Sequence, residues 1–190
     1  MRPGPHDTDA RRRLYARALL LLMLALLAFL GFLALSGCGG PSFDGTTYRS
    51  PSFSFRVGTP PERWRRIDIS YAALAFRDEA ADATIAVNAR CGVDGEDVPL
   101  AALTQHLFLA FTEREIVEQT VVPFDGREAM HSRVSAKLDG VPKNFDVWIL
   151  KKDGCVYDLY LISDPSRHAV DAADFDRFVH GFATVQHHAD

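Results

Sequence analysis

Three of the five Asp-Gly dipeptides in this chain constrain its fold more than any other feature. They stand at residues 125–126, 139–140 and 153–154. Asp-Gly between alternating apolar segments is a strong signal for a two-residue hairpin turn. The strands that these turns join are predicted at residues 116–124, 127–138, 145–150 and 155–163. Consecutive hairpins require an antiparallel sheet over the second half of the chain.

The other predicted elements complete a mixed fold. Period-two alternation and turn signals predict further strands at residues 53–57, 64–70, 74–77 and 84–89. Apolar residues at helical spacing predict a helix over 99–111 and a second helix near the C-terminus, whose packed face is marked by Phe175, Phe178, Val179 and Phe182. Because both helices must bury an apolar face, we expect them to cover the sheet in an α+β sandwich.

Residues 1–37 have the layout of a secretory signal peptide. Four arginines among residues 11–17 precede an apolar stretch from Ala18 to Leu35, which ends in small residues. A short transmembrane helix is the alternative, since a span needs about 20 apolar residues. In both cases the charge order places the following domain on the side of the membrane away from the cytoplasm.

Leu35, Ser36, Gly37 and Cys38 close this stretch, and they resemble the lipobox of bacterial lipoproteins. The resemblance implies cleavage before Cys38, acylation of its thiol and attachment of the chain to a lipid bilayer. An uncleaved anchor with a fortuitous cysteine remains the alternative. We therefore predict a lipoprotein signal peptide at 1–37, a lipidated tether at 38–46, a folded domain at 47–185 and a flexible tail at 186–190. The expected location is a membrane of the cell envelope, inner or outer, with the domain facing the periplasm or the exterior.

The predicted mature chain is acidic. Without residues 1–37 it has 153 residues, 16 of them basic and 23 acidic, for a formal charge of −7. Nucleic-acid binding draws on clustered Lys and Arg side chains, so this balance argues against a nucleic-acid partner. The length suits a single domain with a sizeable core.

Two cysteines remain after Cys38, and each adjoins a glycine at the edge of a predicted strand. Because exported compartments oxidise thiols, we predict a disulfide between Cys91 and Cys155. Two buried free thiols and a redox-active pair are the alternatives. No CxxC spacing is present, and no histidine lies at ligand spacing from either cysteine, so no metal site is predicted.

No motif in the sequence predicts catalysis. The nucleophile elbow, the HExxH zinc motif and the phosphate-binding glycine loop are all missing. Asp171, Asp174 and Asp176 stand at a helix start, where capping explains acidic residues better than a metal does. We therefore predict a protein that is not an enzyme and that needs no cofactor.

One strand presents a possible binding face. Alternation within residues 127–138 places four side chains on one side of the strand, namely Arg127, His131, Arg133 and Lys137. Such a basic stripe suits an anion or an acidic partner, whereas a solvated outer face is the alternative. Trp64, Tyr71 and Trp148 are candidates for an aromatic binding surface, although core packing suits the tryptophans better.

Three segments carry a family resemblance: PSFSFRVGTPPERW at 51–64, AFRDEAADATIAVNA at 75–89 and TVVPFDGREAM at 120–130. Together with the order of helices and hairpins, they resemble the PsbP-like fold over roughly residues 48–184. That family includes photosystem II extrinsic subunits and bacterial envelope lipoproteins. The resemblance implies an α/β/α sandwich around a central antiparallel sheet, and a role in binding or in the assembly of membrane complexes.

Two functions follow from these features. The first is a membrane-anchored, non-catalytic lipoprotein that acts as a binding or assembly module for an envelope complex, with an envelope protein as its partner. The alternative is a ligand-binding lipoprotein that serves a transport system and holds a small or lipidic molecule in a cleft between sheet and helix. A large, enclosed apolar pocket would favour the alternative.

Overall fold

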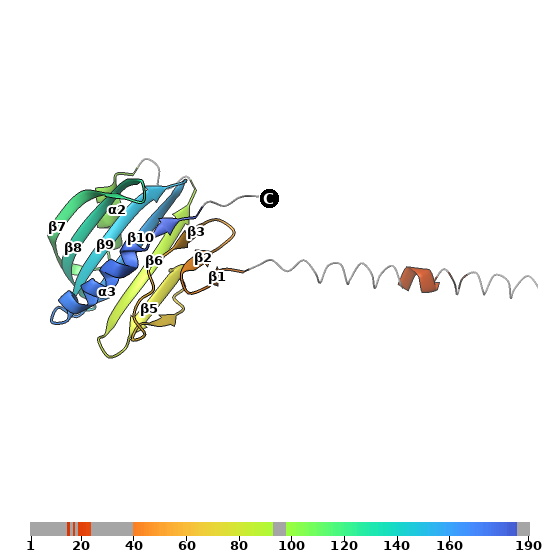
Figure 1. The fold of residues 1–190 in the computed structure, drawn as a ribbon, viewed down its shortest axis with the longest axis horizontal. Helices are drawn as coiled ribbons and strands as arrows, with labels where there is room; N and C mark the ends of the chain where they lie inside the picture. Colours follow the sequence, from red (N-terminus) through yellow and green to blue (C-terminus); the bar gives the residue numbers. More distant parts are fainter. Residues whose placement is uncertain (1–14, 16, 18, 24–39, 93–97, 186–190) are drawn as a thin grey trace, which may run out of the picture. The chain divides into compact units, whose positions relative to one another are not determined.

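A seven-stranded antiparallel sheet organises the domain in the computed structural model (Figure 1). In spatial order its strands are β4 (Arg65–Ile67), β5 (Leu74–Asp78), β6 (Ala83–Cys91), β10 (Cys155–Ser163), β9 (Val141–Lys152), β8 (Arg127–Leu138) and β7 (Thr112–Phe124). A second antiparallel sheet contains β1 (Ser42–Phe43), β2 (Thr47–Arg49), β3 (Ser54–Arg56) and β11 (Ala183–Thr184). The sequence patterns predicted the large sheet and, within residues 53–57, strand β3 of the small sheet, but not β1, β2 or β11, which have only two or three residues each.

The structure describes residues 15, 17, 19–23, 40–92 and 98–185. The chain divides into two compact units, Met1–Gly40 and Pro41–Asp190. None of the helices among the described residues is long and apolar enough to cross a membrane. The predicted lipidation site Cys38 and the predicted tail at 186–190 lie outside the described residues. Strand β1 lies within the segment predicted as the tether.

The three Asp-Gly turns form the predicted hairpins. Residues Phe124 and Arg127 are direct partners in the β7–β8 pair, and the next two hairpins close in the same two-residue way. Each turn has a positive φ at both central residues, such as 45° at Asp125 and 73° at Gly126. A turn with positive φ at both positions matches the right-handed twist of the strands that it joins, which explains why these dipeptides set the register.

Two helices cover opposite faces of the large sheet. Figure 1 shows α3 (His168–His180) across one face and α2 (Leu100–Leu107) behind the other. The small sheet packs on the same face as α3, because Phe55 of β3 shares one core with Phe175 and Phe178 of α3 and with Tyr157 of β10. A smaller core lies beneath α2. The predicted α/β/α sandwich is therefore confirmed, and both cores lie within residues 41–190.

The first helix is shorter than the sequence pattern predicts. It ends at Leu107, whereas the apolar spacing continues to Phe111. Phe108 and Phe111 instead pack against Phe145 of β9, with ring centroids 5.1 and 5.0 Å away. The chain therefore leaves the helix early and enters β7 at Thr112, four residues before the predicted start of that strand. Packing against the sheet outweighs the helical periodicity here.

Two glycines fix the end of α3 against the chain after β3. The Gly58 N–H donates a hydrogen bond to the Phe178 carbonyl oxygen over 3.0 Å. A Cβ atom at Gly58 would lie 2.2 Å from the Arg177 carbonyl oxygen, and one at Gly181 would lie 2.2 Å from the Gly58 nitrogen. Both positions therefore require a residue without a side chain.

We expect Gly58→Ala to destabilise the domain by about 1–3 kcal/mol, the usual cost of overpacking a well-packed site. The reason is that two backbone segments must separate to admit the methyl group. Urea unfolding of the variant and of the unmodified domain measures the effect. Equal stability of the two proteins would contradict the predicted close approach.

Candidate functional site

The predicted basic face of β8 is largely occupied by ion pairs. Arg133 pairs with Glu118 and Lys137 pairs with Glu113, both across the β7–β8 hairpin. Arg127, which belongs to the same predicted face, lines a hollow of about 360 Å³ next to the disulfide. These cross-strand pairs reduce the positive field that an anionic partner would meet. Anion binding by this face stays a prediction.

His131 is held in place by two neighbours. Its Nε2 lies 2.8 Å from Asp146 Oδ1, and its ring stacks on Trp148 with centroids 4.3 Å apart. Trp148 also contacts His180 of α3, at 6.4 Å between ring centroids. Trp148 is half-buried and Trp64 is buried, as the core-packing alternative predicts, whereas Tyr71 is 67% exposed.

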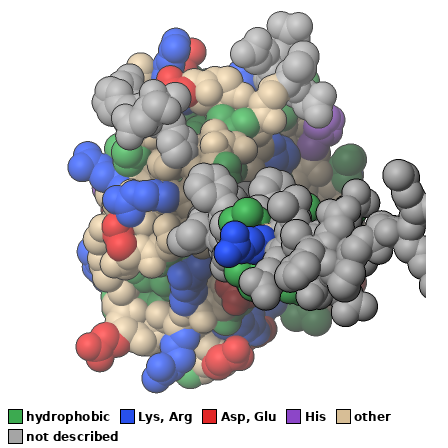
Figure 2. Space-filling view, turned by 90° about the vertical axis from the view of Figure 1, so that its right-hand side faces the viewer, with side chains coloured by type: hydrophobic (Ala, Val, Ile, Leu, Met, Phe, Trp, Pro, Cys, Tyr) green, Lys and Arg blue, Asp and Glu red, His purple; other side chains and the backbone are tan. Residues whose placement is uncertain are grey.

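Charge is mixed on the face that Figure 2 shows. Lys and Arg side chains are interspersed with Asp and Glu side chains there, and no wide field of one sign is visible among the described residues. Long-range steering of a charged partner needs such a field. The charges on this face therefore favour neither a cationic nor an anionic partner.

The disulfide lies between two paired strands. Cys91 of β6 and Cys155 of β10 are direct partners in the strand register, with Cα atoms 4.0 Å apart. The bond closes a sequence separation of 64 residues. It therefore links β6 covalently to β10, the strand of the large sheet that comes last in the sequence.

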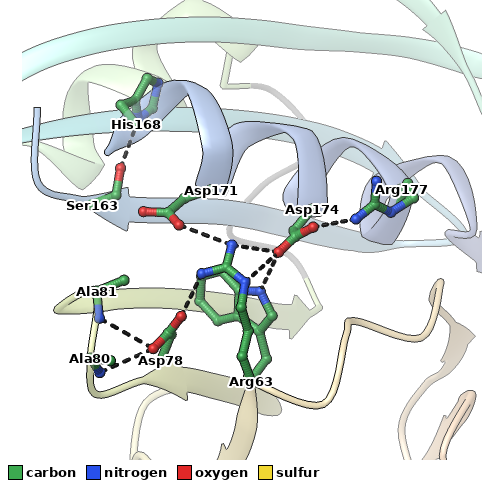
Figure 3. Close-up of polar contacts among 10 residues, drawn as sticks. Arg63, Asp78, Ala80, Ala81, Ser163, His168, Asp171, Asp174 and Arg177 are labelled. Atoms are coloured by element: carbon green, nitrogen blue, oxygen red, sulfur yellow. Dashed lines mark hydrogen bonds and ion pairs between the residues drawn. The ribbon is translucent and has the colours of Figure 1, made fainter. Parts of the chain in front are cut away.

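A buried charge cluster that the sequence did not predict centres on Arg63 (Figure 3). Its Nε donates to Asp174 Oδ2 over 2.8 Å, its Nη2 donates to Asp171 Oδ1 over 3.0 Å, and its Nη1 donates to Asp78. Trp64 Nε1 also donates to Asp174 Oδ2, over 2.9 Å. The cluster joins β5 and α3 through the segment before β4, so its role in this geometry is structural.

The capping interpretation holds only in part: Asp171 stands in the first turn of α3, as the helix-dipole argument expects, whereas Asp174 does not. The α3 N-terminus has no side-chain cap hydrogen bond, and both carboxylates bind Arg63 instead. The fully buried Asp171 needs that partner, because an unpaired buried charge is very costly. Asp176 is exposed and lies near His180 on the same helix.

Hydrogen bonds lower the pKa of Asp78, the third carboxylate that binds Arg63. Burial alone would raise the pKa of Asp78, but hydrogen bonds from Arg63 and from the backbone N–H groups of Ala81 and Ala80 outweigh it. The pKa therefore lies below its usual value, and the carboxylate is ionised at neutral pH. A group that is ionised and saturated with donors is a poor general base.

One serine–histidine pair has a structural explanation. Ser163 Oγ lies 2.7 Å from His168 Nδ1, at the turn that leads into α3. Burial lowers the pKa of His168, so the imidazole is neutral at pH 7. Ser163 is itself completely buried, and Asp146 pairs with His131 rather than with His168. A substrate could not reach this hydroxyl. Among the described residues, no three His, Cys, Asp or Glu side chains are grouped to hold a metal ion.

An apolar site lies between α2 and the large sheet, and we call it the aromatic cleft. It has a volume of about 350 Å³ and is half open to solvent. Its floor comes from β6, β9 and β10, and its walls come from the end of α2, the following turn and the loop before β5. The lining residues are Tyr71, Asn88, His106, Leu107, Phe108, Phe111, Phe145, Val147, Tyr160 and Ile162.

The lining of the aromatic cleft has aromatic and aliphatic side chains with a few polar groups and no acidic or lysine or arginine side chain. Burial raises the pKa of Tyr160, with smaller contributions from Tyr71 and Asp158, so its phenol stays neutral. The amide of Asn88 and the imidazole of His106 supply the other polar groups. An apolar concave surface with a few convergent polar groups is the usual form of a small-molecule site. Only Tyr71 was identified from the sequence as a binding candidate, because the other members come from four separate segments.

Comparisons with known proteins support the fold. Neither a protein-family model nor a curated protein sequence matches the chain. Among solved structures, cyanobacterial PsbP (CyanoP) from Synechocystis sp. PCC 6803 is similar, with a TM-score of 0.55 and 15% identity over 80% of this chain and 99% of that one. LpqN from Mycobacterium tuberculosis, a protein involved in cell envelope biogenesis, has a TM-score of 0.53 and 14% identity over 77% of this chain and 90% of that one. At these identities the likeness concerns the fold alone, and residues 41–190 adopt a PsbP-like fold.

Proposed function

We propose that this chain is a membrane-anchored, non-catalytic binding module of the cell envelope. The aromatic cleft is the observation that carries the binding role. It is concave, and its lining combines apolar rings with a few polar groups, from Asn88, His106 and Tyr160. The similarity to LpqN supports the envelope as its setting.

The anchor part of the proposal rests on Cys38. Strand β1 begins at Ser42, four residues later, and four residues span at most about 14 Å. An acylated Cys38 would therefore hold the domain close to the membrane surface. Mass spectrometry of the native protein should find the chain starting at a lipid-modified Cys38. An unmodified N-terminus at Met1 would contradict the anchor.

A site-specific cross-linker tests the binding role. We expect a photoreactive amino acid at Tyr71, on the rim of the aromatic cleft, to capture a defined envelope component in intact cells. The control position is Val170 on α3, which is 58% exposed and lies on the opposite face of the sheet. The same products from both positions, or none from position 71, would contradict a binding site at the cleft.

A further inference from the structure

We propose that the aromatic cleft holds the apolar portion of a small, uncharged amphiphile, a hydrocarbon chain or ring system with an uncharged hydrogen-bonding group. This assignment rests on the proposed binding function and specifies its ligand. The cleft's volume of about 350 Å³ lies within the range of about 300–1,000 Å³ usual for small-molecule sites. A folded partner would need a wider surface than this.

The aromatic walls pack firmly against one another. Phe108, Phe111 and Phe145 contact one another in a closed triangle, with ring centroids 5.0 to 5.5 Å apart. Strands β9 and β10 supply Val147 and Ile162 from a continuous sheet. A ligand therefore finds a formed apolar surface and has little protein structure to order, which favours affinity.

The lining selects against charge. It contains no Lys, Arg, Asp or Glu side chain, so a ligand charge placed inside would lose water without gaining an ionic partner. Asp158, a buried carboxylate on the same strand as Tyr160, is bound to Arg90 over 2.6 Å. Asn88, His106 and the neutral phenol of Tyr160 instead suit a hydroxyl, ether or amide group on the ligand.

A second hollow gives the ligand's polar portion a place to lie. It has a volume of about 460 Å³ and shares Tyr71, Tyr160 and Ile162 with the aromatic cleft. Its lining also has two cations, Arg77 and Lys143, and two carboxylates, Asp82 and Asp139, and both cations pair with Asp82. Because these charges balance one another locally, an uncharged head group fits this hollow better than an ionic one.

The test uses N-phenyl-1-naphthylamine, an uncharged probe whose fluorescence rises in apolar surroundings, with the purified domain of residues 41–190. Both cores and the disulfide lie inside this segment, so it can fold without residues 1–40. We expect saturable binding. Ile162→Trp, which fills the cleft, should weaken probe binding by about tenfold or more. Val170→Trp adds the same bulk on the exposed face of α3 and should leave binding unchanged.

Tyr71→Ala provides a second variant that does not endanger folding, since Tyr71 is 67% exposed. Loss of its ring contact should weaken probe binding by about threefold to tenfold. Competition tests the charge preference: 1-decanol should displace the probe at a concentration at least about tenfold lower than decanoate or decyltrimethylammonium does.

Three results would overturn the assignment: no saturable binding, equal binding by Ile162→Trp and Val170→Trp, or equal displacement by the charged and uncharged decyl compounds. A separate outcome distinguishes the ligand class from the proposed binding function. If the probe does not bind but a cross-linker at Tyr71 captures one protein in cells, the aromatic cleft is a protein-binding site. The domain is then still a binding module, and only the ligand class is wrong.

Discussion

Replacing Arg63 by methionine is expected to lower the free energy of unfolding by about 3–5 kcal/mol, the usual cost of removing one partner from a buried ion pair. Asp78, Asp171 and Asp174 all bind this guanidinium, and all three carboxylates are buried. Methionine keeps much of the side-chain volume but leaves these charges without their common partner. The loss should appear as a lower urea midpoint with an unchanged slope, because the folded state keeps its compactness.

Arg49→Met is the matched control for Arg63→Met. Arg49 pairs with Asp44, but the two side chains are 54% and 48% exposed. Exposed pairs contribute about 0–1 kcal/mol, so this variant should unfold almost like the parent domain. A similar loss in both variants would mean that removal of a positive charge, rather than burial of the three carboxylates, determines the stability.

Acid should weaken the stabilisation that the same cluster provides. The pKa of Asp78 is lower in the folded domain than its ordinary value of 3.8. Its contribution to stability is therefore complete above that value and is lost as the pH falls through the folded pKa. The parent domain should lose stability between pH 4 and the folded pKa, whereas Arg63→Met should lose less over the same interval. An equal acid dependence of both proteins would contradict the role of Arg63.

The sheet could be predicted from sequence because its signals are local. Each Asp-Gly turn is specified by two adjacent residues, and the alternation around it identifies which side chains face the core. In the small sheet only β3 was predicted, within residues 53–57, because the other strands have two or three residues and are too short for a periodic pattern. The position of the small sheet depends on Phe55 packing against Tyr157 and Phe182, far away in the sequence.

The charge cluster and the aromatic cleft also could not be predicted from the sequence, because both depend on residues that are far apart in it. Arg63 contacts Asp174 across 111 positions of sequence, and no local pattern distinguishes that arginine from Arg65 or Arg66. The cleft forms only because the chain leaves α2 early and inserts Phe108 and Phe111 beside the sheet. Sequence periodicity describes elements, whereas both sites are formed by the packing of elements against one another.

Removing the disulfide is expected to have a comparable effect on stability. The variant Cys91→Ala/Cys155→Ala should lose about 4 kcal/mol, because in the chain-entropy model a bond that closes a loop of this length restricts the unfolded chain by that amount. The bond spans 64 residues of sequence. The β6–β10 pairing continues through the other residues of both strands, so the fold itself should persist in the variant.

Reductant provides the internal control for this prediction. Dithiothreitol should lower the urea midpoint of the parent domain to near that of Cys91→Ala/Cys155→Ala, and it should leave the variant unchanged. If the reduced parent is much more stable than the variant, loss of the Cys155 side chain from the core causes the effect, since Cys155 is buried. If reduction has no effect on the parent, the covalent link does not limit the unfolded chain. Agreement between the reduced parent and the variant would instead show that the disulfide stabilises this domain through its unfolded state.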